Sequence, residues 1–462
     1  MAHDGKACWQ RAINLTLMLK AGAGHRICRL QAELLAAFDK ASYEDGFLAL
    51  WLSELLVSAR IPNTHAGHIA QKLESLGKIA GCKCEYFGEH DYISAAQEFY
   101  QFAKNTSKSA EMLVAKAECL EKKAANALSS ATPTHMLALT FYNDALNIYR
   151  AIPRSNRAAY RIEERIERLK VLIADSGRHS LEELSPIETS LDIAEMVKNA
   201  IASVSSKPIS EALRCFIAIH YTVKTCEMRK EAIEDLKRSP FSAMCSSMLF
   251  SQDGRIIARG NGADVDRLDV PECEDAITSE MIKLYRIHVT LGVQGRIWPA
   301  LGRLRAEHRL RETFFIDMAS RSPILPGNRA QSWGKALFAG YDNDFLSALH
   351  LLIPQIENLV RVYLKQTGID TTHIDPNGVR TENGLSSLLD LPDAVKVLGE
   401  NLAFEFKILF CDARGPNLRN ELAHGLLDDD ACESTSAVYV WWLMLRLVFN
   451  SVCKSEKQKQ PS

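Results

Sequence analysis

The sequence predicts a mostly α-helical protein in three parts: a helical N-terminal region, a small α+β middle segment with one hairpin, and a C-terminal helical bundle. Apolar residues recur at helical spacing through most of the 462 residues. Only one stretch carries a clear β-hairpin signal. Apolar residues make up 47% and charged residues 24% of the chain, an ordinary globular composition that can bury several cores.

The first part, residues 1–176, is expected to be helical throughout. Within 109–128, for example, Leu113, Ala117, Leu120 and Ala124 lie on one helical face. The consecutive helix pairs resemble a short tetratricopeptide-type array, most closely at 145–149, although no strict repeat is present. An ordinary helical domain is the alternative interpretation. An array would offer a docking surface for a protein partner.

The middle part, residues 177–329, is expected to begin with a linker at Gly177–Ile187. It contains the hairpin signal, in which residues 248–252 meet 255–258 across Asp253-Gly254. Asp-Gly supplies the positive φ angles of a two-residue hairpin turn. Residues 276–315 are expected to return to helix, with interruptions at glycines and a proline.

A cluster of arginines in this last stretch, which includes Arg303, Arg305 and Arg309, is the best candidate for a basic patch that binds RNA. The alternative, which the sequence favours modestly, is a surface helix that packs on the C-terminal domain. The net charge of −2 excludes a basic field over the whole protein, so any contact with nucleic acid must be local.

The third part, residues 330–454, is expected to form four or five helices, and residues 455–462 a polar tail. A first helix at 345–365 is followed by a polar loop at 368–384. A long apolar helix at 434–452 closes the bundle. Pro416 is expected in the first turn of the helix before it, where its missing N–H costs nothing.

That helix carries Arg419 and His424, the strongest chemical signal in the chain. Arginine presents a planar fork of donors that fits phosphate oxygens and stabilises developing negative charge. Histidine exchanges protons near neutral pH, so it can act as a general acid or base. The pair is suited to phosphodiester cleavage without a metal.

Helix geometry constrains how these groups can cooperate. At about 100° per residue, Arg419 and His424 lie about 140° apart around one helix. Asn420, His424 and Asp428 instead share a face at successive i, i+4 steps, so Asn420 and Asp428 are expected to orient His424. The angular gap makes a composite site in a homodimer more plausible than a site within one chain.

The first helix of the bundle presents a second polar stripe of His350, Glu357 and Arg361. We expect Glu357 to face the motif helix and to form an ion pair with Arg419. This pair would either tune the electrostatic effect of the guanidinium or occupy its hydrogen-bond donors. A buried Arg–Glu pair can equally serve only to fix helix packing.

The motif also supports a family resemblance. Arg419-Asn420-x-x-x-His424-Gly425 matches the R-N-x-x-x-H-G motif of an uncharacterised domain family of bacteria and eukaryotes, which resembles a branch of the HEPN superfamily. The stretches at 348–357 and 424–430 are similar to that family, and the resemblance covers about 330–450. It implies RNA cleavage without a metal, by dimers, often in toxin, anti-phage or RNA-processing roles. Other members bind RNA or nucleotides, or serve as scaffolds, without cleaving.

Several other classes of function are excluded. There is no P-loop, and the spacing of Cys82, Cys84, His90 and Cys119 matches no zinc pattern, so no metal or cofactor is expected. The N-terminus lacks a signal-peptide pattern, and the twelve cysteines are expected to be free thiols of a cytoplasmic protein. The longest apolar run, 438–445, ends at Arg446 and is shorter than the ~20 residues that span a bilayer.

Two hypotheses follow from the sequence. The first is an endoribonuclease in which Arg419 and His424 are catalytic, with support from Asn420, Glu357 and Asp428. The second is a non-catalytic HEPN-like module that binds RNA or protein, attached to a helical scaffold.

Overall fold

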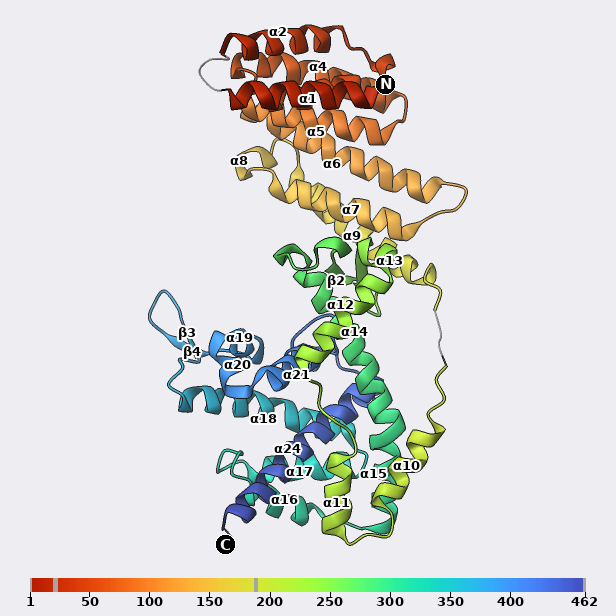
Figure 1. Ribbon diagram of the computed structural model, residues 1–462, viewed down its shortest axis with the longest axis vertical. Helices are drawn as coiled ribbons and strands as arrows, with labels where there is room; N and C mark the ends of the chain where they lie inside the picture. The colour runs from red at the N-terminus through yellow and green to blue at the C-terminus, as the bar shows by residue number, and fades with distance from the viewer. Residues whose placement is uncertain (1, 20–23, 187–189, 460–462) are drawn as a thin grey trace. The chain divides into compact units, whose positions relative to one another are not determined.

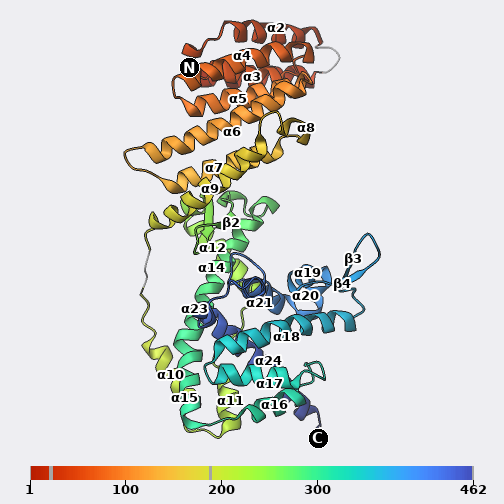
Figure 2. The same cartoon turned by 180° about the vertical axis from the view of Figure 1, so that it is seen from behind.

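The protein folds as two compact units. The computed structural model describes residues 2–19, 24–186 and 190–459. Unit 1 comprises Met1–Ile187 with Phe250–Ile256, and unit 2 comprises Glu188–Leu249 with Ile257–Ser462. Both are built mainly of helices, and two two-stranded sheets are the only sheets in the described ranges (Figures 1 and 2). The predicted mostly α fold with a small α+β segment is therefore confirmed.

Unit 1 is an array of consecutive helices. Helix α5 packs mainly against α4 and α6, helix α6 against α5 and α7, and helix α7 against α6 and α9 (Figure 1). Two hydrophobic cores result, one around the first helices and one around the last. Packing between nearest neighbours is the mode of association in helical solenoids. The elements are α1 (Ala2–Met18), α2 (Gly24–Lys40), η2 (Tyr43–Asp45), α3 (Leu48–Ser58), α4 (Asn63–Cys82), α5 (Tyr86–Phe102), α6 (Thr106–Ser129), α7 (His135–Ala151), α8 (Arg154–Arg157) and α9 (Ile162–Glu182).

Helix α9 corrects the position of the expected linker. It runs through Gly177 to Glu182, so most of the stretch expected to be linker is helical. Gly177 is instead a position of close approach, because a Cβ there would lie 2.4 Å from the backbone oxygen of Gly254. A glycine is equally common in linkers and at positions where two backbones approach closely. The linker predicted to begin at Gly177 is wrong for this reason.

The next stretch contains the predicted hairpin. Strands β1 and β2 pair, so the predicted hairpin is confirmed. Its turn differs from the expected two-residue type, because Gly254 has a positive φ of 81° and Asp253 does not have a positive φ. The interruptions expected at Gly292, Gly295 and Pro299 are changes of helix type without a loop. Helix α14 ends at Gly292, the π-helical turn η5 contains Gly295, and α15 has Pro299 in its first turn. The elements are α10 (Ala194–Val204), α11 (Ile209–Ala218), α12 (Thr225–Arg238), α13 (Pro240–Met244), β1 (Ser247–Phe250), β2 (Ile256–Gly260), η3 (Val265–Arg267), η4 (Pro271–Cys273), α14 (Glu274–Gly292), η5 (Val293–Ile297), α15 (Trp298–Glu307) and α16 (Glu312–Arg321).

The C-terminal stretch holds a second hairpin that the sequence prediction missed. The expected polar loop contains antiparallel strands β3 and β4, with Thr372 opposite Glu382. Its turn is made by the Asp375 carboxylate, which accepts from the backbone N–H of Asn377, and by Gly378 at a φ of 84°. The elements are α17 (Ala330–Tyr341), α18 (Phe345–Gln366), β3 (Thr372–Ile374), β4 (Arg380–Glu382), α19 (Leu385–Leu389), α20 (Pro392–Leu398), α21 (Glu400–Phe410), α22 (Leu418–Ala423), α23 (Asp429–Cys432) and α24 (Thr435–Lys459).

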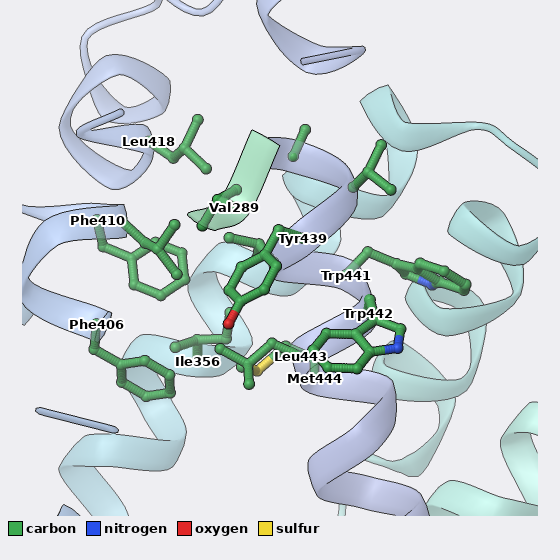
Figure 3. Close-up of a cluster of buried hydrophobic side chains, with 14 of the residues drawn as sticks. Val289, Ile356, Phe406, Phe410, Leu418, Tyr439, Trp441, Trp442, Leu443 and Met444 are labelled. Carbon is green, nitrogen blue, oxygen red and sulfur yellow. The ribbon is translucent and has the colours of Figure 1, made fainter. Parts of the chain in front are cut away.

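Helix α24 is the centre of unit 2. It contacts α11, α14, α16, α17 and α18, and its residues 437–445 are all buried (Figure 3). The predicted middle and C-terminal parts therefore share one hydrophobic core. The helix also runs on to Lys459, through most of the stretch expected to be a polar tail.

By length and composition alone, this helix would be able to cross a membrane. Within Asp429–Lys457, the most apolar stretch of 18 residues has a mean hydropathy of 1.4, but 67% of that stretch is buried inside the protein. Arg446 does not interrupt it, because its guanidinium donates to the backbone oxygen of Ile217 at 3.1 Å. Burial of this kind is what the core helix of a globular unit shows, so the span is weak evidence for a membrane segment.

Candidate functional site

Arg419 lies on α22, a short helix anchored by the preceding residue. Leu418 is 2% exposed and packs into the core of unit 2 (Figure 3). The helix begins after Asn417, which caps it in the left-handed conformation with a φ of 51°. Pro416 therefore precedes the cap. The prediction that it lies in the first turn of the helix is wrong. The cause is that asparagine tolerates the left-handed region; its side chain makes no capping hydrogen bond to the helix.

The Arg419 guanidinium is held by an acid of α18, as predicted. Its Nε donates to Oε2 of Glu357 at 3.0 Å, and one Nη donates to the Asn420 side-chain oxygen at 3.3 Å. Arg361 donates to the other Glu357 oxygen at 2.8 Å. One carboxylate thus joins two arginines, and the prediction that Glu357 faces the motif helix is confirmed. His350 of the same stripe is exposed, and within the described ranges its one hydrogen bond is between its ring Nδ1 and the backbone oxygen of Leu346.

The carboxylate at the centre of this network is kept ionised. Burial raises the pKa of Glu357, but the hydrogen bonds from Arg361 and Arg419 outweigh it and hold that pKa below its ordinary value. The side chains of Glu357, Arg361 and Arg419 are only 19%, 16% and 27% exposed. These charges are therefore weakly screened by solvent, and the network fixes the direction of the Arg419 side chain.

One end of that guanidinium lies close to a glycine. A Cβ at residue 384 would lie 2.7 Å from Nη2 of Arg419, so a larger residue in place of Gly384 would displace the guanidinium. Among the described residues, no protein acceptor is hydrogen-bonded to this nitrogen. Arg361 secures the same loop by donating to the backbone oxygen of Asn383 at 2.7 Å.

His424 follows the last helical residue of α22 and is exposed. Its backbone N–H donates to the oxygen of Asn420 at 3.0 Å. Its ring makes no hydrogen bond or ion pair with any residue that the structure describes. The imidazole is therefore free to meet a ligand from solvent, about one turn beyond Arg419.

The expected alignment of Asn420, His424 and Asp428 on one helical face is wrong. The helix ends at Ala423, and Gly425 turns the chain with a φ of 66°. The Asn420 amide donates to the side chain of Asn417 at 2.7 Å, and Asp428 caps α23 by accepting from a backbone N–H. Asn420 thus contacts Arg419 and not the histidine ring.

The predicted arginine patch is largely engaged within the protein. Arg303 donates to the hydroxyl of Ser205 at 3.0 Å and pairs with a glutamate of its own helix. Arg305 pairs with Asp342 at 3.0 Å. Arg309 lies beyond the end of α15 and is exposed. The contacts of Arg303 and Arg305 favour the alternative interpretation, in which this helix packs on its neighbours and does not bind RNA.

Replacing Glu357 by glutamine is expected to lower the stability of unit 2 by about 1–3 kcal/mol at pH 7, because two half-buried arginines lose an anionic acceptor. The folded pKa of Glu357 is depressed, so its contribution is present at neutral pH and is lost as the pH falls through that value. Urea unfolding should show a difference in the free energy of unfolding between wild type and the variant at pH 7, and a smaller difference at pH 3. The exposed Glu433→Gln change is the control, and a deficit that persists unchanged at pH 3 would contradict the ionic assignment.

Glu357 and Asn420 could be inferred from their places in the motif and the polar stripe. The contact of Gly384 with Arg419 could not be inferred, since nothing in the local sequence of that glycine marks a contact with a distant arginine. Comparisons with protein-family models, curated proteins and solved structures find no match to this chain.

Proposed function

We propose that unit 2 carries a metal-independent endoribonuclease site of HEPN type. Arg419 would bind the scissile phosphate, and His424 would act as general acid and base. The observation that supports this best is the contrast between the two side chains. Arg419 is fixed by Glu357 and Asn420 with its Nη2 unoccupied by the described protein groups, while His424 is exposed and its ring is unengaged.

The chemistry needs only groups that this chain supplies. The ribose 2′-oxygen attacks phosphorus, and a neutral His424 accepts the 2′ proton. The bond to the 5′-oxygen breaks, and a protonated histidine donates to that leaving oxygen. The products are a 2′,3′-cyclic phosphate and a 5′-hydroxyl. Arg419 stabilises the extra negative charge on the phosphate oxygens during the transfer.

The two proton transfers favour a homodimer formed through the C-terminal region. One histidine cannot be neutral and protonated at the same moment. In a two-fold dimer, His424 accepts the proton and His424 of the partner subunit donates one. The exposure of His424 leaves it accessible to such a second copy. We place the activity in the cytoplasm, consistent with twelve free cysteines.

A cleavage assay tests this proposal. Wild type and the His424→Ala and Arg419→Ala variants are mixed with end-labelled RNA in EDTA. We expect wild-type cleavage with cyclic-phosphate ends and a loss of about 100-fold or more in each variant. His350→Ala, which removes an exposed histidine of α18, is the matched control and should cleave normally. Equal cleavage by His424→Ala, or none by wild type, would refute the assignment.

The second candidate is a non-catalytic module that binds RNA or protein, with the unit 1 array as the scaffold. The Glu357 network favours it, because an arginine bound to an acid between α18 and α22 also secures helix packing. It predicts that Arg419→Ala lowers the melting temperature and that no variant changes RNA cleavage. Unchanged stability of His424→Ala combined with lost cleavage would exclude this candidate.

A further inference from the structure

Unit 1 contains a cavity of about 470 Å³ that is separate from the candidate site. It lies between the segment before α3, the start of α5, and the facing sides of α6 and α7. This volume is typical of sites for small molecules. Six aromatic residues line it: Tyr43, Phe47, Tyr86, Phe87, Tyr92 and Phe141.

One cation, Lys123 of α6, reaches the wall of this cavity. The residue is only 7% exposed. Its Nζ lies 4.2 Å from the ring centroid of Phe87 and 5.7 Å from that of Phe141, and both rings line the cavity. Attraction to these ring faces offsets part of the cost of burying the charge. Burial lowers the pKa of Lys123, as expected for an ammonium that loses water.

No protein acceptor is hydrogen-bonded to this ammonium among the described residues. Its neighbour Lys122 shows the usual arrangement, since it is exposed and pairs with Glu89 at 2.8 Å. The one carboxylate on the cavity wall, Glu85, accepts from the hydroxyl of Tyr43, which helps to raise the pKa of Tyr43 to about 12. Asp91 and Glu89 act on the charge of Lys123 through space, without a hydrogen bond or ion pair to it in the described part of the chain. A buried cation without a hydrogen-bonded acceptor is costly, so an acceptor brought by a ligand would be favoured.

We propose that this cavity binds a small aromatic carboxylate. Its carboxylate accepts from Lys123, and its ring packs among the aromatic side chains, where edge and offset contacts add to burial. One unpaired cation matches one negative charge, whereas a phosphate dianion would meet a single cation with Glu85 on the same wall. Asn126, three residues after Lys123 on the same helical face, also lines the cavity and presents a second donor.

Calorimetric titration of the full-length protein tests the proposal, with naphthylacetate and its neutral amide, naphthylacetamide, as probes. Wild type should bind the acid roughly tenfold or more tightly than the amide, the value of one charge-assisted hydrogen bond. Lys123→Met keeps the length of the side chain and should reduce acid binding to the level of the amide. Lys78 is a surface lysine of α4 outside the cavity, so Lys78→Met should leave the affinities for the acid and for the amide unchanged.

A second variant separates the cavity from the charge. Leu137 lines the cavity and is 44% exposed, so Leu137→Trp should narrow the cavity without touching the lysine and weaken both probes together. Thermal melts establish that each variant is folded. Equal affinity of wild type for acid and amide, undiminished acid binding by folded Lys123→Met, or no binding of the acid at millimolar concentration would overturn the proposal.

Discussion

Replacing Glu405 by glutamine is expected to stabilise unit 2 increasingly as the pH rises from 5 to 8. Glu405 lies on α21, is 1% exposed, and accepts from the hydroxyl of Tyr439 at 2.7 Å. Burial raises its pKa from 4.5 to about 7, although hydrogen bonding by Tyr439 and the charge of Arg446 act in the opposite direction. The carboxyl is therefore largely protonated in the folded state below pH 7.

The sign of the effect follows from proton linkage. In the unfolded chain, Glu405 ionises near its ordinary pKa of 4.5, while the folded protein keeps the proton until about pH 7. Between these values the unfolded state binds fewer protons, so the free energy of unfolding falls as the pH rises. The loss is about 3 kcal/mol, at about 1.4 kcal/mol per pKa unit. Glutamine stays neutral and can still accept from Tyr439, so the variant avoids this loss.

Urea unfolding at four pH values between 5 and 8 measures the effect as a difference between variant and wild type, which cancels the titration of all other groups. The difference should grow by about 3 kcal/mol across the range. Glu400→Gln, an exposed change on the same helix, is the control and should follow the wild-type dependence. A difference that is constant from pH 5 to 8 would show that burial does not retain the proton.

The predictions that succeeded rest on local patterns or on simple charge complementarity. Gly254 takes the positive φ that a tight turn requires, so the first hairpin could be placed from sequence, although Asp253 does not take the positive φ of the expected turn type. Glu357 and Arg419 are opposite charges on apolar helices that must pack, so their pairing could be anticipated. Helical periodicity likewise predicted the mostly α fold.

The predictions that failed depend on tertiary contacts or on competing turn chemistry. The polar strands β3 and β4 lack the alternation of apolar and polar residues that marks a strand, so the sequence predicts a loop there. The end of α22 is set by the left-handed Gly425, which left His424 outside the helix and removed its expected contacts. Nothing in the local sequence marks Lys123 as part of a binding site, because the rings that it contacts, Phe87 and Phe141, are distant from it in sequence.

Replacing Trp441 by alanine is expected to cost about 3–5 kcal/mol of stability. The side chain is fully buried in unit 2, and its Nε1 donates to the backbone oxygen of Leu337 on α17 at 2.9 Å (Figure 3). Its ring also contacts Phe216 and Phe345, at 6.1 and 5.9 Å between centroids. The variant thus loses these apolar contacts and the hydrogen bond from the indole to Leu337.

Thermal unfolding measured by circular dichroism should show the transition of unit 2 lowered by roughly 6–20 °C. Trp298→Ala is the control, because that indole is 40% exposed and its loss should cost far less. An equal shift for the two tryptophans would mean that α24 is not the packing centre of this unit.

The contact of Trp441 with Gly340 makes the expected losses strongly non-additive. A Cβ at residue 340 would lie 2.2 Å from the Cδ1 atom of Trp441, so Gly340→Ala should destabilise wild type by about 1–3 kcal/mol through overpacking. In the Trp441→Ala background, the same methyl group enters space that the indole has left, and its cost should vanish or reverse. A double-mutant cycle measures this coupling directly, and additive losses would show that α17 and α24 do not meet at these two residues.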